Sequence, residues 1–361
     1  MREIIILAVL AALAVGALFL VGLPSAKVSQ NQATAEVEPV GAIETVAPPT
    51  TTTVPLPEAA RGVAVDPQKG YWVEELGDGL YFLTDGLYTT MFLTTGRGVI
   101  AVDAPPSLGA RYLDAVAEVT DEPITHVVYS HSHPDHIGAA HLFPADAVYV
   151  AHAETAARVA DGHHPHREFP WGVFVGGAAV PVPSVTFEDG YALSVGNQTL
   201  ELSYKGPAHE PGNIYIYAPR QRVLMLVDVI FPGWSPFDAL AEAAQSEPFV
   251  EAHDDVLDYD FAHFIGGHLN RTGTRADVLA QWEYVHDMRA HAAAALLSVD
   301  FSAIAARVGG DNPWRLFKAY LDAVAEECAA LTLPKWRDRL GGVETFTFSH
   351  CYRLMMGIRL E

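Results

Sequence analysis

Cysteine is almost absent from this sequence of 361 residues, which contains only Cys328 and Cys351. Their wide separation lacks the close spacing of a zinc knuckle, so a metal site in this chain must draw on other ligands. In an exported protein the two thiols can pair as one disulfide, whereas in a reducing compartment they would stay as two buried thiols. The sequence leaves both interpretations open.

Basic side chains are also scarce. The chain has 22 lysine and arginine residues against 44 aspartate and glutamate residues, which gives a formal net charge of −22. That balance argues against a nucleic-acid partner, because such a partner requires a basic face. It does not exclude anionic substrates, because a buried metal pair can dominate the local field. We expect a small-molecule substrate and no nucleic acid, and the sequence leaves the oligomeric state open.

The N-terminal residues are typical of an export signal. Arg2 precedes an apolar run over residues 4–23, and the small residues before Lys27 suit a signal peptidase. The run is also as long as a helix that spans a bilayer. We therefore predict that residues 1–26 are a signal peptide or a membrane anchor. In either case the rest of the chain is expected to be exported, to the periplasm or the extracellular space.

Composition and patterning divide the remaining chain into three parts. Residues 27–61 are rich in Thr and Pro and poor in aromatics, which predicts a linker. Residues 62–298 are the predicted catalytic domain, and residues 299–361 are a predicted C-terminal helical extension. Hydrophobic residues make up 50% of the chain, enough for a sizeable core.

Two β-rich stretches, each followed by helical patterns, predict a mixed α/β fold. The predicted strands cover residues 80–83, 89–93, 99–102, 126–129, 148–150, 184–187, 198–204, 213–218, 223–227 and 261–265. The predicted helices cover residues 107–119, 154–160, 275–297, 303–308 and 314–331.

A histidine-rich run follows the predicted strand that ends at Tyr129. In an extended backbone residues i and i+2 point the same way, so His131 and His133 can hold one metal ion together. Pro134 stiffens the following turn, and Asp135 and His136 then face a neighbouring position suited to a second ion. Imidazole and carboxylate groups are ligands that zinc prefers.

Three further residues extend this set of potential ligands. His209, Asp228 and His268 each come directly after a strand-like run. Glycines near His209 and His268 would let the backbone approach a metal closely. A purely structural explanation would have to account for all of these positions at once, so we favour a metal site.

The order H-x-H-x-D-H, then His, then Asp, then His resembles the metallo-β-lactamase superfamily. The resemblance covers about residues 71–275, and its first motif is highly specific. It implies a four-layer αββα sandwich, here with extra C-terminal helices, and two zinc ions per chain. Carried over by motif, the first metal would be bound by His131, His133 and His209, the second by Asp135, His136 and His268, and Asp228 would bridge the two.

The resemblance also implies a reaction. Two cations would share a water, lower its pKa and supply hydroxide that attacks an ester-type bond, in a lactone or a related carboxylic ester. Asp135 is the predicted catalytic residue, which would orient the nucleophile or shuttle its proton. A bridging Asp is similar to the arrangement in glyoxalase II, lactonases and phosphodiesterases, whereas some β-lactamases place Cys there.

Four alternatives to ester hydrolysis remain open. The chain could be a β-lactamase-like hydrolase, a thioesterase like glyoxalase II, a phosphodiesterase, or a non-catalytic metal-binding module on the cell surface. Four residues are candidates for substrate contact: Arg271 for an anionic group, His163 at the pocket mouth, and Phe231 and Trp234 as an apolar wall. Phe231 also stands near the position where lactonases of this fold often carry Tyr.

Overall fold

The computed structural model describes residues 55–163 and 168–361, which belong to one compact unit. The predicted signal peptide or anchor over residues 1–26 lies outside the described residues, as does most of the predicted linker over residues 27–61. The end of that linker is ordered. A 3-10 helix, η1, covers Glu58–Ala60, and Ala60 is buried. The folded unit therefore begins earlier than the predicted boundary at residue 62.

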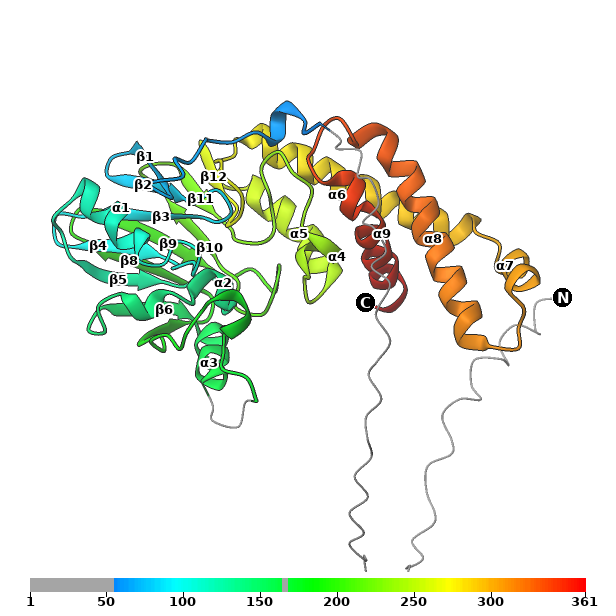
Figure 1. Cartoon of the computed structure of the whole chain (residues 1–361), viewed down its shortest axis with the longest axis horizontal. Helices are drawn as coiled ribbons and strands as arrows, with labels where there is room; N and C mark the ends of the chain where they lie inside the picture. The colour runs from blue at the N-terminus through cyan, green and yellow to red at the C-terminus, as the bar shows by residue number, and fades with distance from the viewer. Residues whose placement is uncertain (1–54, 164–167) are drawn as a thin grey trace, which may run out of the picture. The chain divides into compact units, whose positions relative to one another are not determined.

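The first sheet has seven strands that lie in chain order. They are β1 (Trp72–Gly77), β2 (Leu80–Thr84), β3 (Thr89–Thr94), β4 (Val99–Val102), β5 (Ile124–Val128), β6 (Val148–His152) and β7 (Val185–Phe187). Strands β1 to β4 pair antiparallel, and β4 to β7 pair parallel. The connection from β4 to β5 contains α1 (Arg111–Val119), and the connection from β6 to β7 contains α3 (Ala153–Gly162) (Figure 1).

The second sheet has five strands in the order β12-β11-β10-β9-β8. They are β8 (Gly190–Val195), β9 (Gln198–Ser203), β10 (Tyr215–Ala218), β11 (Val223–Met225) and β12 (His263–Ile265). Only the last pair, β11 with β12, is parallel. Its crossover carries α4 (Asp238–Ala241) and α5 (Ser246–Leu257).

Three buried hydrophobic clusters define the layers. One contains residues of both sheets, such as Phe82 and Ile216, and fills the space between them. A second lies between the seven-stranded sheet and α1, where Tyr112 is buried. The third joins the five-stranded sheet to α5 and the C-terminal helices, with Phe249 in its interior. This order confirms the predicted αββα sandwich.

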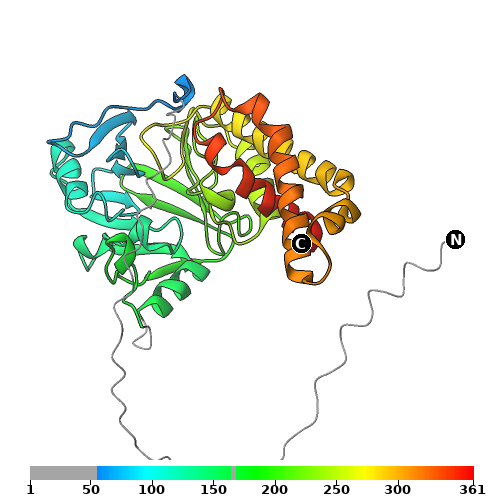
Figure 2. The same ribbon diagram turned by 45° about the vertical axis from the view of Figure 1, so that its right-hand side comes forward.

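The C-terminal region consists of four helices. They are α6 (Arg275–Ser298), α7 (Phe301–Val308), α8 (Pro313–Trp336) and α9 (Val343–Leu360). Helices α6, α8 and α9 contact one another, as Figure 1 shows, and Figure 2 keeps the orange and red helices adjacent from another direction. Helix α9 was not among the predicted helices. Within the described residues no division between compact units falls at residue 298, where the predicted extension begins.

A disulfide joins Cys328 of α8 to Cys351 of α9, so the structure selects the paired interpretation of the two cysteines. No individual helix in residues 55–163 and 168–361 has the length and apolar composition of a membrane span. The bent pair formed by α6 and α7 passes that test only when the two are taken together. The remaining short elements are α2 (Pro134–Ile137) and two 3-10 helices, η2 (Ala140–Leu142) and η3 (Val173–Val175).

Candidate metal centre

The histidine-rich run forms a loop between β5 and the short helix α2. Pro134 occupies the first turn of α2, where its missing N–H costs no hydrogen bond. His131 is fully buried, and its Nδ1 lies 2.9 Å from the hydroxyl of Ser130. The Ser130 backbone N–H donates to the buried Asp103 carboxylate at 2.7 Å. These contacts fix the ring so that the other nitrogen, Nε2, remains for the site.

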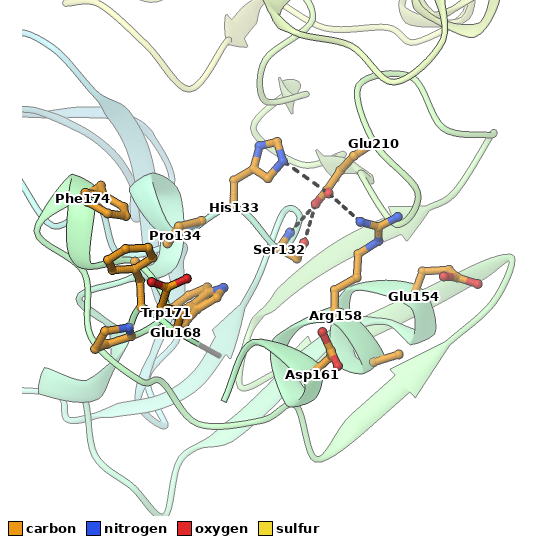
Figure 3. Close-up of a pocket in the computed structure, with 14 residues that line it drawn as sticks. Ser132, His133, Pro134, Glu154, Arg158, Asp161, Glu168, Trp171, Phe174 and Glu210 are labelled. Carbon is orange, nitrogen blue, oxygen red and sulfur yellow. Dashed lines mark hydrogen bonds and ion pairs between the residues drawn. The ribbon is translucent and has the colours of Figure 1, made fainter. Parts of the chain in front are cut away.

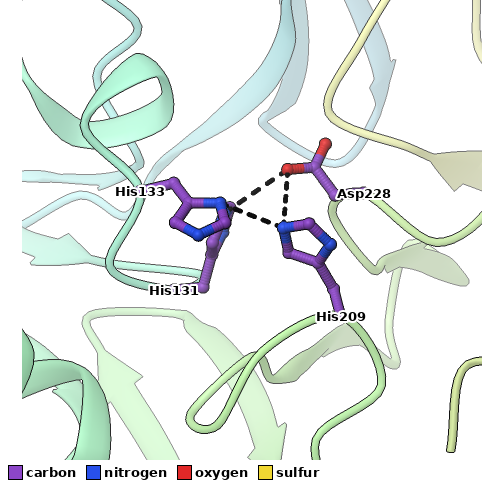
Figure 4. Close-up of side chains that lie close together, drawn as sticks. All are labelled: His131, His133, His209 and Asp228. Carbon is purple, nitrogen blue, oxygen red and sulfur yellow. Dashed lines mark hydrogen bonds and ion pairs between the residues drawn. The ribbon is translucent and has the colours of Figure 1, made fainter. Parts of the chain in front are cut away.

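The first group of potential ligands comprises His131, His133, His209 and Asp228, whose ligand atoms all lie within 4.8 Å of one another (Figure 4). His209 Nε2 lies 3.0 Å from His133 Nδ1. Asp228 Oδ2 lies 3.4 Å from His131 Nε2 and 3.5 Å from His209 Nε2. The structure thus brings together residues from three separate loops.

The second group comprises Asp135, His136 and His268, and it adjoins the first. His136 Nε2 lies 3.1 Å from His268 Nε2. Asp228 Oδ1 lies 2.9 Å from His268 Nε2, and Asp228 Oδ2 lies 3.1 Å from His136 Nε2. The Asp228 carboxylate therefore contacts histidines of both groups, which is the position expected of a bridging ligand.

Unusual backbone geometry at two positions brings the ligands close together. Asp228 follows β11 with φ of 63°, in the left-handed region that non-glycine residues rarely adopt. Gly267 has φ of 91°, and a Cβ there would lie 2.5 Å from Val227 and 3.2 Å from the His136 ring. A glycine at residue 267 is therefore needed for His268 to approach His136 so closely.

The electrostatics of the cluster favour a cation beside Asp228. Burial would raise the pKa of the Asp228 carboxyl, but His136 and His268 outweigh burial and hold it well below its ordinary value. Burial would lower the pKa of His136, but Asp228 and Asp135 raise it to about 9. Burial lowers the pKa of His209 to about 3, which leaves that imidazole neutral, as a metal ligand must be.

The residues present fit a metal site by one further observation. His131 Nε2 is buried and has no hydrogen-bond partner among the described residues. A buried nitrogen without a partner is costly unless something else satisfies it. A set of imidazole nitrogens with carboxylate oxygens is the donor set that zinc and related divalent ions prefer.

Glu210 belongs to this site, although sequence analysis did not single it out. Its carboxylate lies 3.3 Å from His133 Nε2 and accepts hydrogen bonds from the backbone N–H and hydroxyl of Ser132, at 2.8 and 2.7 Å (Figure 3). Burial would raise the pKa of Glu210, but its bond to His133 and the nearby imidazoles lower it. Glu210 therefore holds His133 with Nδ1 turned toward the cluster. Its position next to His209 in the sequence was the available signal.

Tyr88 is the second residue that the sequence did not reveal. It lies in the loop between β2 and β3, and its hydroxyl donates to Asp135 at 3.3 Å. Its ring packs against those of His136 and His268, with centroids 5.4 and 4.6 Å away. Burial, followed by the neighbouring Asp135, raises the pKa of Tyr88, so the phenol keeps its proton. No local pattern marks a tyrosine so far from the ligands in the sequence.

A cavity of about 490 Å³ opens onto the two ligand groups. Phe231 and Trp234, the predicted apolar wall, line it together with Leu87, Phe237 and Phe346. Among the described residues no lysine or arginine lines the cavity. Its walls are mainly apolar, and its polar groups include the cluster together with Ser235 and Glu242.

Arg271, a predicted substrate contact, makes its polar contacts within the fold. Its guanidinium forms a bidentate ion pair with Asp277 at 3.0 Å and donates to the backbone carbonyls of Ala59 and Thr272. It does not line the cavity. Arg271 instead secures the N-terminal segment to the start of α6, because each of its three guanidinium nitrogens donates to a group of the fold.

The structure places His163, predicted at the pocket mouth, beside Val180 and Trp171. It accepts a hydrogen bond from the backbone of Val180 at 3.2 Å and packs edge-on against Trp171. It lines a separate pocket with Trp171 and Ala178, not the cavity above the cluster. The histidine is held by neighbouring backbone instead of facing substrate.

A second depression of about 800 Å³ lies on the other side of His133. Glu210 and Arg158 line it, with Oε2 of Glu210 3.5 Å from the Arg158 guanidinium (Figure 3). Phe169 and Phe174 are exposed at this groove. It shares His133 with the cavity but contains no other member of the two ligand groups.

One wall of the cavity contains a left-handed turn. Ala239, Leu240, Ala241 and Glu242 have φ of 50°, 64°, 54° and 56° in succession. The element labelled α4 is therefore left-handed, with Ala241 N–H bonded to Phe237 O at 2.9 Å and Glu242 N–H to Asp238 O at 2.8 Å. Left-handed geometry costs an L-residue about 1–2 kcal/mol, so the surrounding structure must impose it.

Comparisons with known proteins agree with this geometry. The family model for the metallo-beta-lactamase superfamily matches residues 64–287. The alpha subunit of a 2,4-dinitroanisole O-demethylase from Nocardioides sp. (strain JS1661) is 29% identical over 162 residues, 43% of this chain and 44% of that protein. Metallo-beta-lactamase domain-containing protein 1 of Mus musculus is 38% identical over 119 residues, 32% of this chain and 41% of that protein. The chain spans less than half the length of these curated relatives.

A solved structure extends the likeness in fold. The stereoselective inverting sec-alkylsulfatase Pisa1 from Pseudomonas sp. aligns with a TM-score of 0.53 at 17% identity, over 80% of this chain and 50% of the alkylsulfatase. At that identity the match concerns the fold alone. The family match covers more than half of the chain, and the described residues supply its ligand pattern. The chain therefore belongs to the metallo-beta-lactamase superfamily, with the His/Asp metal site of a hydrolase of that family.

Proposed function

We propose that this protein is a two-zinc hydrolase that cleaves an ester-type bond, in a lactone or a related carboxylic ester. The observation that carries the proposal is the position of Asp228, whose two carboxylate oxygens contact histidines of both ligand groups. A carboxylate so placed suits two cations held close together over one apolar cavity.

The proposed metal ligands follow the two groups. His131, His133 and His209 would hold one ion, Asp135, His136 and His268 the other, and Asp228 both. Zinc bound there would act as a Lewis acid and lower the pKa of bound water toward neutrality. We favour zinc as the metal because each of the two groups offers a few closely spaced imidazole and carboxylate donors, which are ligands that zinc prefers.

Two residues of the chain would handle protons beside the metals. Asp135 is the less buried of the two carboxylates, since its side chain is 24% exposed against 7% for Asp228, and it faces the cavity. We assign it the orientation of the attacking water and the transfer of its proton. The Tyr88 phenol, hydrogen-bonded to Asp135, keeps its proton and would donate to the oxygen on which charge develops. Tyr88 would thus supply the hydroxyl that lactonases of this fold often carry near the position of Phe231, where this chain has none.

The cavity supports an ester over a β-lactam. Its wall of Phe231, Trp234 and Phe346 would pack against an acyl chain or ring. An alkoxide leaving group needs little assistance, whereas the nitrogen of an opened β-lactam must be stabilised or protonated. We therefore expect higher kcat/KM for a lactone than for a cephalosporin or a carbapenem.

A substrate panel tests this proposal. Zinc-loaded full-length protein is assayed with an acyl lactone, a carboxylic ester, a thioester, a phosphodiester, a cephalosporin and a carbapenem. The panel includes 2,4-dinitroanisole and a secondary alkyl sulfate, because these compounds appear in the names of the O-demethylase relative and of the alkylsulfatase with a similar fold. We expect the lactone or the ester to give the highest kcat/KM, and loss of activity on chelation. A higher value for any other class would overturn the ester assignment.

We also propose that the protein acts outside the cytoplasm. Residues 1–26 would direct its export, either as a cleaved signal peptide or as a membrane anchor formed by residues 4–23. The Cys328–Cys351 disulfide supports an oxidising compartment. Fractionation of cells that make the full chain tests this, and recovery only from the cytoplasm would contradict it. The proposed partner is a small-molecule substrate.

A further inference from the structure

Glu242 ends the left-handed turn and lines the cavity above the metal ligands. Its backbone N–H bonds to Asp238 O, but its exposed carboxylate has no hydrogen-bond or ion-pair partner among residues 55–163 and 168–361. The other acidic side chains of the cavity, Asp135 and Asp228, belong to the ligand groups. Glu242 is therefore the one carboxylate of the described cavity lining that remains for a substrate.

Helix α9 holds the turn in place from behind. The Ser349 hydroxyl accepts from the backbone N–H of Ala239 at 3.1 Å, and His350 Nε2 lies 2.8 Å from the backbone oxygen of Phe237. Arg353 donates to the backbone oxygen of Ala244 at 2.8 Å. These contacts at both ends of the turn fix the place of Glu242 instead of leaving it on a free loop.

The surroundings of Glu242 favour a positive charge. The cavity is lined by Trp234, Phe237 and Phe346, with ring centroids of Phe237 and Phe346 5.1 Å apart. Aromatic faces attract an ammonium group, and a nearby carboxylate adds to that attraction. In the part of the chain that the structure describes, no lysine or arginine of the lining competes for the carboxylate.

We propose that Glu242 and this aromatic wall bind a cationic, ammonium-type group of the substrate while the scissile ester lies at the metals. Glu242 is then a specificity-determining residue, and the substrate class narrows to esters that carry a positively charged substituent. This inference rests on the proposed ester hydrolysis. It assigns to the left-handed turn the task of placing one carboxylate at the substrate.

A pair of matched esters tests it. Choline butyrate and 3,3-dimethylbutyl butyrate have the same shape and differ in a quaternary nitrogen against a carbon. Zinc-loaded full-length protein should show at least about fivefold higher kcat/KM for the choline ester, mainly through KM. Glu242→Gln should abolish most of that preference, chiefly by raising KM for the choline ester. Glu201→Gln, an exposed position on β9, is the matched control and should change neither value.

Binding without turnover gives an independent measurement. Calorimetry should show that choline binds the zinc-loaded protein more tightly than 3,3-dimethylbutanol, and that Glu242→Gln removes the difference. If both esters are cleaved equally well, or if Glu242→Gln behaves as Glu201→Gln does, the inference is overturned while ester hydrolysis stands. If neither ester is cleaved, the proposed function fails for these esters, and the choline measurement alone decides whether Glu242 binds a cation.

Discussion

The metal end of the cavity and the wall around Glu242 are built in different ways. The metal end uses loops after strands β5, β9, β11 and β12, all within the matched family segment. The wall combines a left-handed turn with α9, which lies beyond that segment. The metal end therefore lies wholly within the family segment, whereas the wall also depends on a helix outside it. Substitutions at the metal end should therefore lower metal content or turnover, whereas substitutions at the wall should change substrate preference or stability.

The largest effect is expected at Asp228. Asp228→Asn should lower turnover by at least about a hundredfold and reduce the metal content, because the carboxylate shared by the two ligand groups is lost. Asparagine tolerates the left-handed φ of this position, so the fold should survive where Asp228→Ala adds backbone strain. Elemental analysis and kcat/KM are the measurements. Asp338→Ala, an exposed position after α8, is the control, and equal losses in both variants would refute the ligand assignment.

A smaller effect is expected at Glu210, which touches a ligand but is not one. Glu210→Gln should weaken zinc affinity by roughly tenfold to a hundredfold, because His133 loses the carboxylate that orients it. Competition with a chromophoric chelator measures that affinity. Glu154→Gln, on the same groove, should leave it unchanged. Unchanged affinity in Glu210→Gln would show that His133 is positioned by other contacts.

Tyr88→Phe should lower kcat by about tenfold with normal metal content, since it removes one hydrogen bond to a developing charge and no ligand. Steady-state kinetics together with elemental analysis separate the two effects. Tyr191→Phe, on the exposed surface of β8, provides the comparison. A loss of metal in Tyr88→Phe would mean that the tyrosine supports the ligands and not the reaction.

The smallest effect on turnover is expected at the disulfide behind the wall. Reduction, or the double substitution Cys328→Ser with Cys351→Ser, should lower the free energy of unfolding by about 3 kcal/mol, because the unfolded chain regains freedom. Metal content and kcat for a small ester should change less than about twofold, because neither cysteine approaches the ligands. Thermal unfolding with and without reductant measures the stability. A complete loss of metal on reduction would show that the two ends of the cavity are not independent.

The comparison also shows what a sequence can reveal. All seven potential ligands lie in one histidine-rich run or follow a strand, so short patterns locate them. The sheets that carry them follow from alternating hydrophobic strands. The wall depends on contacts between distant segments. Helix α9 is rich in aromatic and β-branched residues that do not favour a helix locally, and its packing against α6 and α8 overrides that preference.

Single residues illustrate the same limit. Arg271 looked available for an anion because Asp277 and Ala59, which occupy its guanidinium, are recognisable only in the folded chain. Nothing local predicts that Ala239 to Glu242 would adopt left-handed geometry, since none of these residues is glycine. Tyr88 reaches Asp135 only because β2 and β3 lie in the same sheet as β5.

The central claim is that two zinc ions bound by the seven ligands perform ester hydrolysis, and a zinc titration tests it most directly. Metal-free full-length protein is titrated with zinc while bound metal and lactone hydrolysis are measured in the same samples. The account predicts that activity reaches its maximum when two zinc ions are bound per chain, and that Asp228→Asn binds fewer and stays inactive. Full activity with one ion or none, or two bound ions with no hydrolysis of any ester, would contradict it.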